Sequence, residues 1–153
     1  MAKSKKSKKS LQSYIKYCAI IFAIVGMIMT LFVFVQNNSR GFTGLQVIFG
    51  CADKGPFATI EQLSFSFMAL FTILLPIIGS VSVLFNNTLV RIIGTALMLV
   101  GTILCFLIPN FVVYANVVTE ASFANAGLGV GSILAGVLFG LGTCCNFYSI
   151  VEK

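Results

Sequence analysis

Four long runs of apolar residues constrain this chain more than any other feature of its sequence. They cover about residues 14–35, 65–85, 89–114 and 123–150, and none holds an ionisable residue in its central part. Each exceeds the roughly 20 residues that a helix needs to cross about 30 Å of hydrocarbon. A segment in hydrocarbon must pair its own backbone polar groups, which a helix does. The runs therefore predict four transmembrane helices.

Composition indicates that lipid surrounds most of the side chains. Only 9% of the residues are charged and 58% are hydrophobic, whereas soluble domains carry about 25% charged residues. The first run is longer than the roughly 7–15 apolar residues of a cleaved signal peptide, and no small-x-small cleavage site follows it. We predict an all-α integral membrane protein, with a basic tail (1–13) and a single four-helix membrane domain (14–150).

The distribution of basic residues predicts the orientation. The tail holds most of the net charge of +6, as Lys3, Lys5, Lys6, Lys8 and Lys9. Arg91 lies beside the short connection between runs two and three, and Lys153 ends the chain. The opposite connections, 36–64 and 115–122, carry only Arg40 and Lys54, accompanied by Asp53, Glu61 and Glu120. Since cytoplasmic loops are enriched in Lys and Arg, we expect both termini in the cytoplasm of a plasma-membrane protein, with a long outer loop between helices one and two.

The lysine tail predicts a partner as well as an orientation. Basic residues beside a membrane attract anionic lipid headgroups by about 1 kcal/mol each. Nucleic-acid binding is not expected, because the tail has no interleaved aromatic residues and no folded reader domain follows it.

The connections and prolines predict how the helices are arranged. The tight turn Asn86-Asn87-Thr88 predicts that spans two and three pack as antiparallel neighbours. Pro76 and Pro109 predict kinks, because proline removes a helical hydrogen bond. The two halves show no internal repeat, which argues against an inverted-repeat transporter.

Small residues recur at intervals of four in the fourth run. They form two strips, one of Gly127, Gly131 and Ala135 and one of Ser132, Gly136 and Gly140. Such strips allow close approach of another helix, so we expect two tight neighbours, either within the bundle or in another protomer or partner protein. Gly94 and Gly101 make the helix of the third run a candidate packing partner for that of the fourth. If a strip mediates association, leucine at Gly136 and Gly140 will abolish it.

The long outer connection is apolar for a loop. Phe42, Leu45, Val47, Ile48 and Phe49 stand in a segment where glycines bracket residues 45–49. We interpret those residues as a short strand or an interfacial segment, which forms either a cap over the bundle or a docking surface.

The sequence lacks the residue types that catalysis and metal binding need. There is no His, and the few acidic residues of the connections are not clustered. General acid–base chemistry needs a proton-exchanging group and metals need clustered ligands, so we predict no enzyme, cofactor or metal site. Among the cysteines, Cys51 is either a free thiol or a link to another chain. Cys144 and Cys145 are either packing residues or, in a eukaryotic host, acylation sites.

The layout of four spans, cytoplasmic ends and a long first outer loop resembles that of the claudin-type tetraspan proteins. The resemblance is one of architecture, because this chain has no Trp and its first loop has a single cysteine, Cys51. The claudin loop signature has a tryptophan and two cysteines, so no functional residue is carried over.

These patterns predict a non-catalytic membrane protein that acts through helix and loop contacts, as an accessory or structural subunit. The alternative is a small homo-oligomeric channel or transporter for an uncharged solute. It requires that Thr72, Ser80, Thr95 and Thr102 share one face of the assembled bundle.

Overall fold

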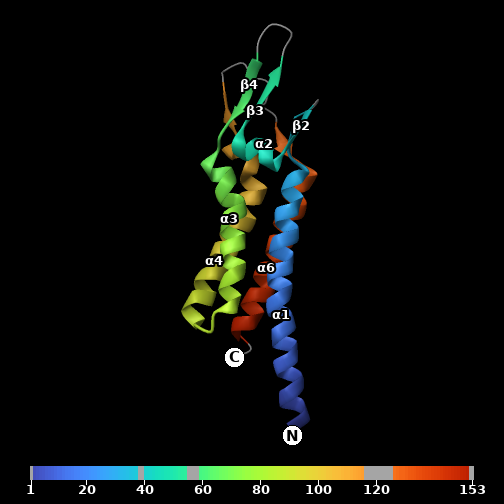
Figure 1. Ribbon diagram of the computed structural model, residues 1–153, viewed down its shortest axis with the longest axis vertical. Coiled ribbons are helices and arrows are strands. Elements are labelled where there is room, and N and C mark those ends of the chain that lie inside the picture. The colour runs from blue at the N-terminus through green and yellow to red at the C-terminus, as the bar shows by residue number, and fades with distance from the viewer. Residues whose placement is uncertain (1, 38–39, 55–58, 116–125, 152–153) are drawn as a thin grey trace.

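The computed structural model describes residues 2–37, 40–54, 59–115 and 126–151, with side chains from Tyr14 onward except at 37, 53–54 and 59–61. Four helices form an elongated bundle, and short strands gather at one end of it (Figure 1). We call this end the strand end. The opposite end, where the first helix begins and the last one ends, is the terminal end.

The helices of the bundle are α1 (Ala2–Ile28), α3 (Phe67–Val81), α4 (Thr88–Leu107) and α6 (Val130–Val151). Short 3-10 turns extend the first three of them: η1 (Met29–Leu31), η2 (Ser82–Leu84) and η3 (Ile108–Phe111). Among the described residues, four helical segments are long and apolar enough to cross a membrane: Tyr14–Leu31, Phe67–Leu84, Thr88–Phe111 and Val130–Val151. The expected number of candidate spans is confirmed, and the chain has the features of a multi-pass membrane protein.

Side-chain caps define where two of the helices begin. The Ser66 hydroxyl accepts a hydrogen bond from the Ala69 backbone N–H at the start of α3. The Asn87 side chain accepts one from the Leu89 N–H at the start of α4. Caps of this kind satisfy backbone donors that have no partner within the helix. The Asn87 cap lies in the tight turn between α3 and α4, which pack against each other as that turn predicts.

The first and fourth apolar runs include more than helix. Residues 33–35 of the first run belong to strand β1 (Val33–Asn37), and α6 begins only at Val130. The start of the fourth run, at Phe123, lies outside the described residues. Hydropathy does not separate a helix from a buried strand of β-branched and aromatic residues, which explains the overextended boundaries.

Two small antiparallel sheets make the all-α prediction incomplete. One sheet has the order β2-β1-β6 and pairs β1 with β2 (Arg40–Thr43) and β6 (Gly127–Leu128). The other has the order β3-β4-β5, formed by β3 (Cys51–Lys54), β4 (Thr59–Ser64) and β5 (Val113–Tyr114). Each sheet joins the first long connection to a segment far along the chain.

A short helix, α2 (Gly44–Phe49), joins β2 to β3, so the strand alternative for this segment is wrong and the interfacial alternative stays a prediction. Thr43 and Gln46 form a capping box at its start, with the Gln46 side chain accepting a hydrogen bond from the Thr43 N–H at 2.9 Å. Reciprocal caps of this kind stabilise a helix N-terminus. We call the six strands and α2 together the strand module.

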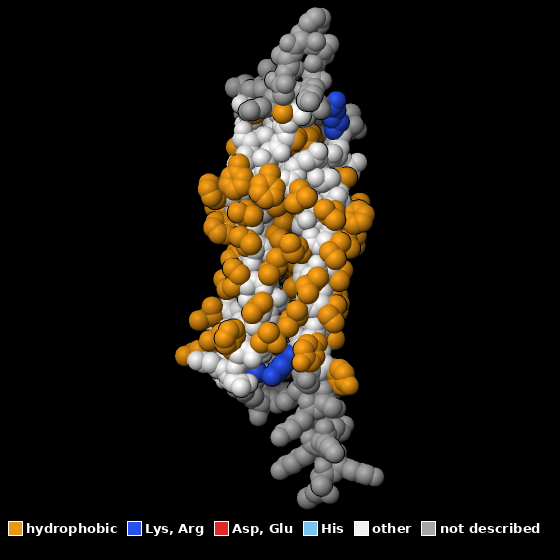
Figure 2. Space-filling model, viewed as in Figure 1, with side chains coloured by type: hydrophobic (Ala, Val, Ile, Leu, Met, Phe, Trp, Pro, Cys, Tyr) orange, Lys and Arg blue, Asp and Glu red, His pale blue; other side chains and the backbone are white. Residues whose placement is uncertain are grey.

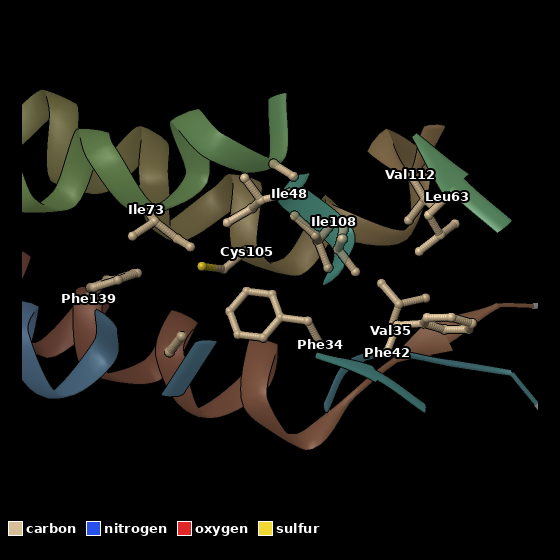
Figure 3. Packing of buried hydrophobic residues seen from close by; sticks show 13 residues of the cluster. Phe34, Val35, Phe42, Ile48, Leu63, Ile73, Cys105, Ile108, Val112 and Phe139 are labelled. Atoms are coloured by element: carbon tan, nitrogen blue, oxygen red, sulfur yellow. The ribbon is translucent and has the colours of Figure 1, made fainter. Parts of the chain in front are cut away.

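One hydrophobic cluster continues from the bundle into the strand module (Figure 3). Phe139, Cys105 and Ile73 come from the helices, while Phe34 and Ile48 come from the module. All are at least nine-tenths buried. Because a shared apolar core resists separation of the two parts, the module is fixed on the bundle.

Candidate functional site

The closest helix contact lies between α3 and α4, where glycines leave no room for a side chain. A Cβ on Gly94 would overlap the Ser82 side chain, and one on Gly101 would overlap the Pro76 ring. The nearest neighbours of Gly94 and Gly101 therefore belong to α3 and η2, while α4 as a whole also packs against α6, as the sequence suggests. Because Gly101 has no side chain, its backbone packs directly against the Pro76 ring.

The two small-residue strips of α6 lie mainly inside the bundle. Gly131 contacts the junction of η1 and β1, and Gly136 contacts Phe106 and Cys105 of α4. Ala135 and Ser132 are fully buried. Gly127 is exposed in β6, and Gly140 is half-buried near Thr102. α6 thus has two close helix neighbours, α1 and α4. A leucine at Gly136 would disturb this packing, so its effect on association cannot be separated from its effect on the bundle.

The four hydroxyl groups of the alternative channel are bonded within single helices. Thr72 and Ser80 are buried in α3, whereas Thr95 and Thr102 are half-buried on α4. Each donates to a carbonyl of its own helix at 2.8–3.0 Å, and such bonds satisfy a hydroxyl inside an apolar medium. Their sharing one face of an assembled oligomer stays a prediction.

The strongest polar site of the described residues lies near the terminal end. It is formed by Ser82, Arg91, Asn146 and Ser149, which we call the terminal polar cluster. All four are at least nine-tenths buried, and they come from η2, α4 and α6. Polar residues at membrane depth are costly and mark functional sites, so this cluster is the first place to look for activity.

Asn146 is the least satisfied member of the cluster. Its Nδ2 is 3.5 Å from the Gly79 carbonyl and 3.7 Å from the Met98 sulfur. Its Oδ1 is buried and accepts no hydrogen bond from the described residues. Leaving a buried acceptor unpaired costs about 1–3 kcal/mol. The residue therefore strains the packing of α3, α4 and α6 at one point.

Arg91 is 3% exposed although it carries a charge. Its Nε donates to the Phe85 carbonyl at 2.8 Å, and its Nη1 donates to the Ser149 carbonyl at 3.4 Å. Those carbonyls lie where η2 and α6 end, and helix C-terminal ends favour a cation. Arg91 thus joins the ends of two helices to the start of α4.

The cluster shows what the sequence reasoning missed. In the sequence, Arg91 serves only as an orientation signal, and Asn146 carries no prediction. One sequence signal could have found these residues. Polar and charged residues within spans tend to face the bundle interior, and Arg91 and Asn146 stand at the same end of two predicted spans. Their partners lie far along the chain, as the Ser149 carbonyl does for Arg91 and the Gly79 carbonyl for Asn146, so these bonds are not visible in local sequence patterns.

The strand module divides the predicted loop-contact residues into two groups. Phe42, Val47 and Ile48 are buried in the hydrophobic cluster, where they hold α2 over the bundle. Leu45 and Phe49 are exposed. A docking surface in this segment therefore depends on Leu45 and Phe49 alone.

Phe49 belongs to a row of exposed aromatic rings where the module meets α3. Its ring centroid is 6.3 Å from that of Phe65, and Phe65 and Phe67 are 4.7 Å apart in an edge-to-face arrangement. Offset and edge contacts of this type are favourable between aromatic rings. The row begins on the module and ends on the first residue of α3.

Several predicted residues cannot be placed. The side chains of Lys3, Lys5, Lys6, Lys8 and Lys9 lie outside the described part, as do those of Asp53 and Glu61 and the whole of Glu120. Of the cysteines, Cys51 is half-buried on β3, and none of the five forms a disulfide within the described part of this chain. Within the described ranges, no group of His, Cys, Asp and Glu is arranged to hold a metal ion.

Comparison with known proteins adds no family. No protein-family model, curated protein or solved structure matches this chain. The functional argument therefore rests on the geometry of the chain itself.

Proposed function

We propose that this chain is a non-catalytic, four-span membrane protein that acts through protein contacts made by its strand module, as an accessory or structural subunit. Both termini lie in the cytoplasm and the module lies on the opposite side of the plasma membrane. The basic residues of the tail support this orientation, because cytoplasmic segments are enriched in Lys and Arg.

The filled interior of the bundle favours contact over transport. Met98, Phe139 and Phe34 are at most 1% exposed and occupy the space between the helices. Buried hydroxyls bond within their own helices, as described above. Transport or catalysis needs an accessible polar path or a reactive group, and the bundle interior offers large apolar side chains in their place.

The observation that carries the proposal is the group of exposed apolar side chains on and beside the module. Phe49 of α2 is 65% exposed, and its ring lies 6.3 Å from that of the exposed Phe65. Exposed apolar patches of this kind mark contact sites. The exposed apolar side chains Leu45 and Phe49 lie on α2, directly between β2 and β3 in sequence.

Photo-crosslinking in intact membranes tests the proposal. A photoreactive residue at Phe49, which is 65% exposed on the module, should yield one discrete protein adduct. The matched control is Val151, which is 67% exposed at the terminal end and should yield none. An adduct of equal strength from both positions, or from neither, would contradict a contact role of the module.

The orientation is tested separately with reporter fusions. A reporter at residue 153 should be active only in the cytoplasm, and one inserted at residues 55–58 should be active only outside. The reverse result would overturn the proposed orientation and leave the contact role to be judged by crosslinking.

A further inference from the structure

A polar cleft lies on the strand module, where segments of both sheets meet α2. Its volume is about 400 Å³, and its lining includes Arg40 of β2, Gln46 of α2, Cys51 and Ala52 of β3, and Gln62 of β4. The cleft exists because α2 carries the chain from one sheet to the other. Ligand clefts commonly measure about 300–1,000 Å³, so this one has the size of a binding site for a small chemical group.

Hydrogen-bond donors distinguish the described lining of this cleft. Arg40 is exposed and is the only charged residue of the strand module whose side chain is described. Its basic side chain appears at the strand end in Figure 2. A guanidinium has five N–H donors, which is enough for a ligand as well as for neighbours within the protein.

Gln46 adds a second donor to the cleft. Its Oε1 accepts hydrogen bonds from the backbone N–H and the hydroxyl of Thr43, at 2.9 and 3.3 Å. The Nε2 group of the same amide is therefore the part of this side chain that serves a ligand. A guanidinium beside an amide donor suits a group that only accepts hydrogen bonds, such as a carboxylate, which arginine binds through two parallel bonds.

A second cleft, also of about 400 Å³, adjoins the first. Cys51 and Ala52 line both clefts, and Phe49, Leu63 and Phe65 are among the other residues of the second. Phe49 and Phe65 are the exposed rings on which the proposed function rests. The module therefore offers hydrogen-bond donors and aromatic side chains at adjoining places on its surface.

This combination matches the chemistry of a polypeptide C-terminus. The last residue of a chain carries a carboxylate and a side chain on the same Cα atom, so the two groups can enter adjoining clefts. Capture of a C-terminal carboxylate is one of the recurring modes of peptide recognition. The aromatic cleft favours a chain terminus over an inorganic anion, because an inorganic anion would use the donors alone.

From these observations we infer that the strand module binds the free C-terminus of a partner protein whose last residue is apolar. Arg40 and Gln46 hold the carboxylate, and the last side chain lies against Phe49 and Phe65. The inference rests on the proposed contact role of the module, and it adds the chemistry of the partner. Arg40 becomes the residue that recognises the charge, which the apolar side chains of the module do not read.

Fluorescence anisotropy with the full chain in lipid nanodiscs tests this site. The probe is a mixture of fluorescent peptides of random sequence that all end in leucine with a free carboxylate. A matched mixture ends in leucine amide. The carboxylate mixture should bind saturably and about tenfold more tightly than the amide mixture, because hydrogen bonds between charged groups are stronger than those to a neutral amide.

Three variants separate the two clefts. Arg40→Gln should bind both mixtures equally, whereas Arg40→Lys should keep part of the preference, because lysine retains the charge but not the planar fork. Phe49→Ala should weaken the binding of both mixtures and leave the preference for the carboxylate. Arg40 and Phe49 are exposed, so these variants should fold, which circular dichroism checks.

Phe32→Ala is the matched control for the aromatic cleft. Phe32 is 54% exposed, compared with 65% for Phe49, and it lines neither cleft. This variant should bind both mixtures as the wild type does. An equal loss of binding in Phe32→Ala and Phe49→Ala would contradict the assignment of the aromatic cleft.

Other results would overturn the whole inference. Equal or absent binding of the two mixtures by the wild type would do so, as would a preference for the carboxylate that survives Arg40→Gln. Complete displacement of the peptides by N-acetylleucine at equal concentration would also do so, because the site would then bind a small carboxylate and not a polypeptide end. Photo-crosslinking at Phe49 separates this failure from that of the proposed function. A discrete adduct without a preference for the carboxylate contradicts the C-terminus site alone, whereas the absence of a discrete adduct contradicts the contact role.

Discussion

The helical bundle and the strand module use glycine for different physical purposes. In the bundle, Gly79 and Gly94 have ordinary helical backbones, and their value is the missing side chain that lets α3 and α4 touch. In the module, Gly50 joins α2 to β3 with φ +85°, a conformation that side chains rarely allow. Sequence reasoning from small-residue spacing finds the first kind of glycine but has no spacing rule for the second.

The largest expected effect is on the α3–α4 contact. Gly94→Leu would place a side chain against Ser82 and the Gly79 carbonyl, and overpacking of this kind costs about 3 kcal/mol. We expect a large fall in the thermal unfolding midpoint in detergent. Ala96→Leu is the control, because Ala96 lies exposed on the same helix. Equal midpoints for the two variants would show that α3 and α4 are not in such close contact.

A smaller effect, confined to the module, is expected at Gly50. Its φ and ψ of 85° and 167° fall in a region that essentially only glycine adopts. In addition, a Cβ on Gly50 would lie 2.5 Å from the Leu63 carbonyl oxygen. Gly50→Ala should cost about 2 kcal/mol. Hydrogen exchange should rise in α2, β3 and β4 and stay unchanged in α6.

Gly127→Ala is the matched control for the module. A Cβ there would meet only the Gln36 carbonyl, at 3.9 Å, so exchange in the sheet should not change. Faster hydrogen exchange throughout the bundle of the Gly50 variant would contradict the expectation that the destabilisation stays within the module.

The sequence predicts the bundle far better than the module, for a physical reason. A span must be long and apolar throughout, so length and hydropathy alone identify four of them. The strands Val33–Asn37 and Val113–Tyr114 are short and continue apolar runs, and hydropathy does not mark where a helix ends and a buried strand begins. Their pairing joins residues far apart along the chain, which local patterns do not specify.

The same reason explains what could be predicted of the candidate site. The small-residue strips and the turn at Asn87 are local patterns. Gly131 and Gly136 of the strips are closely packed in the structure, whereas Gly127 and Gly140 are not. The terminal polar cluster joins Arg91 to the carbonyl of Ser149, 58 residues further along. Which of two helices Gly94 contacts is likewise a property of the assembled bundle.

The smallest expected effect has the opposite sign and tests whether the bundle interior is only structural. Asn146→Leu removes an unpaired buried oxygen and two contacts of 3.5 and 3.7 Å. Unpaired acceptors cost more than such long bonds contribute, and leucine has a similar shape. We expect a gain of about 1 kcal/mol, seen as a higher unfolding midpoint, whereas Asn146→Ala should lower it by leaving a cavity. If leucine instead lowers the midpoint as alanine does, the Asn146 oxygen has a stabilising partner in the membrane. The terminal polar cluster would then be a binding site in its own right, and the contact role of the protein would no longer belong to the strand module alone.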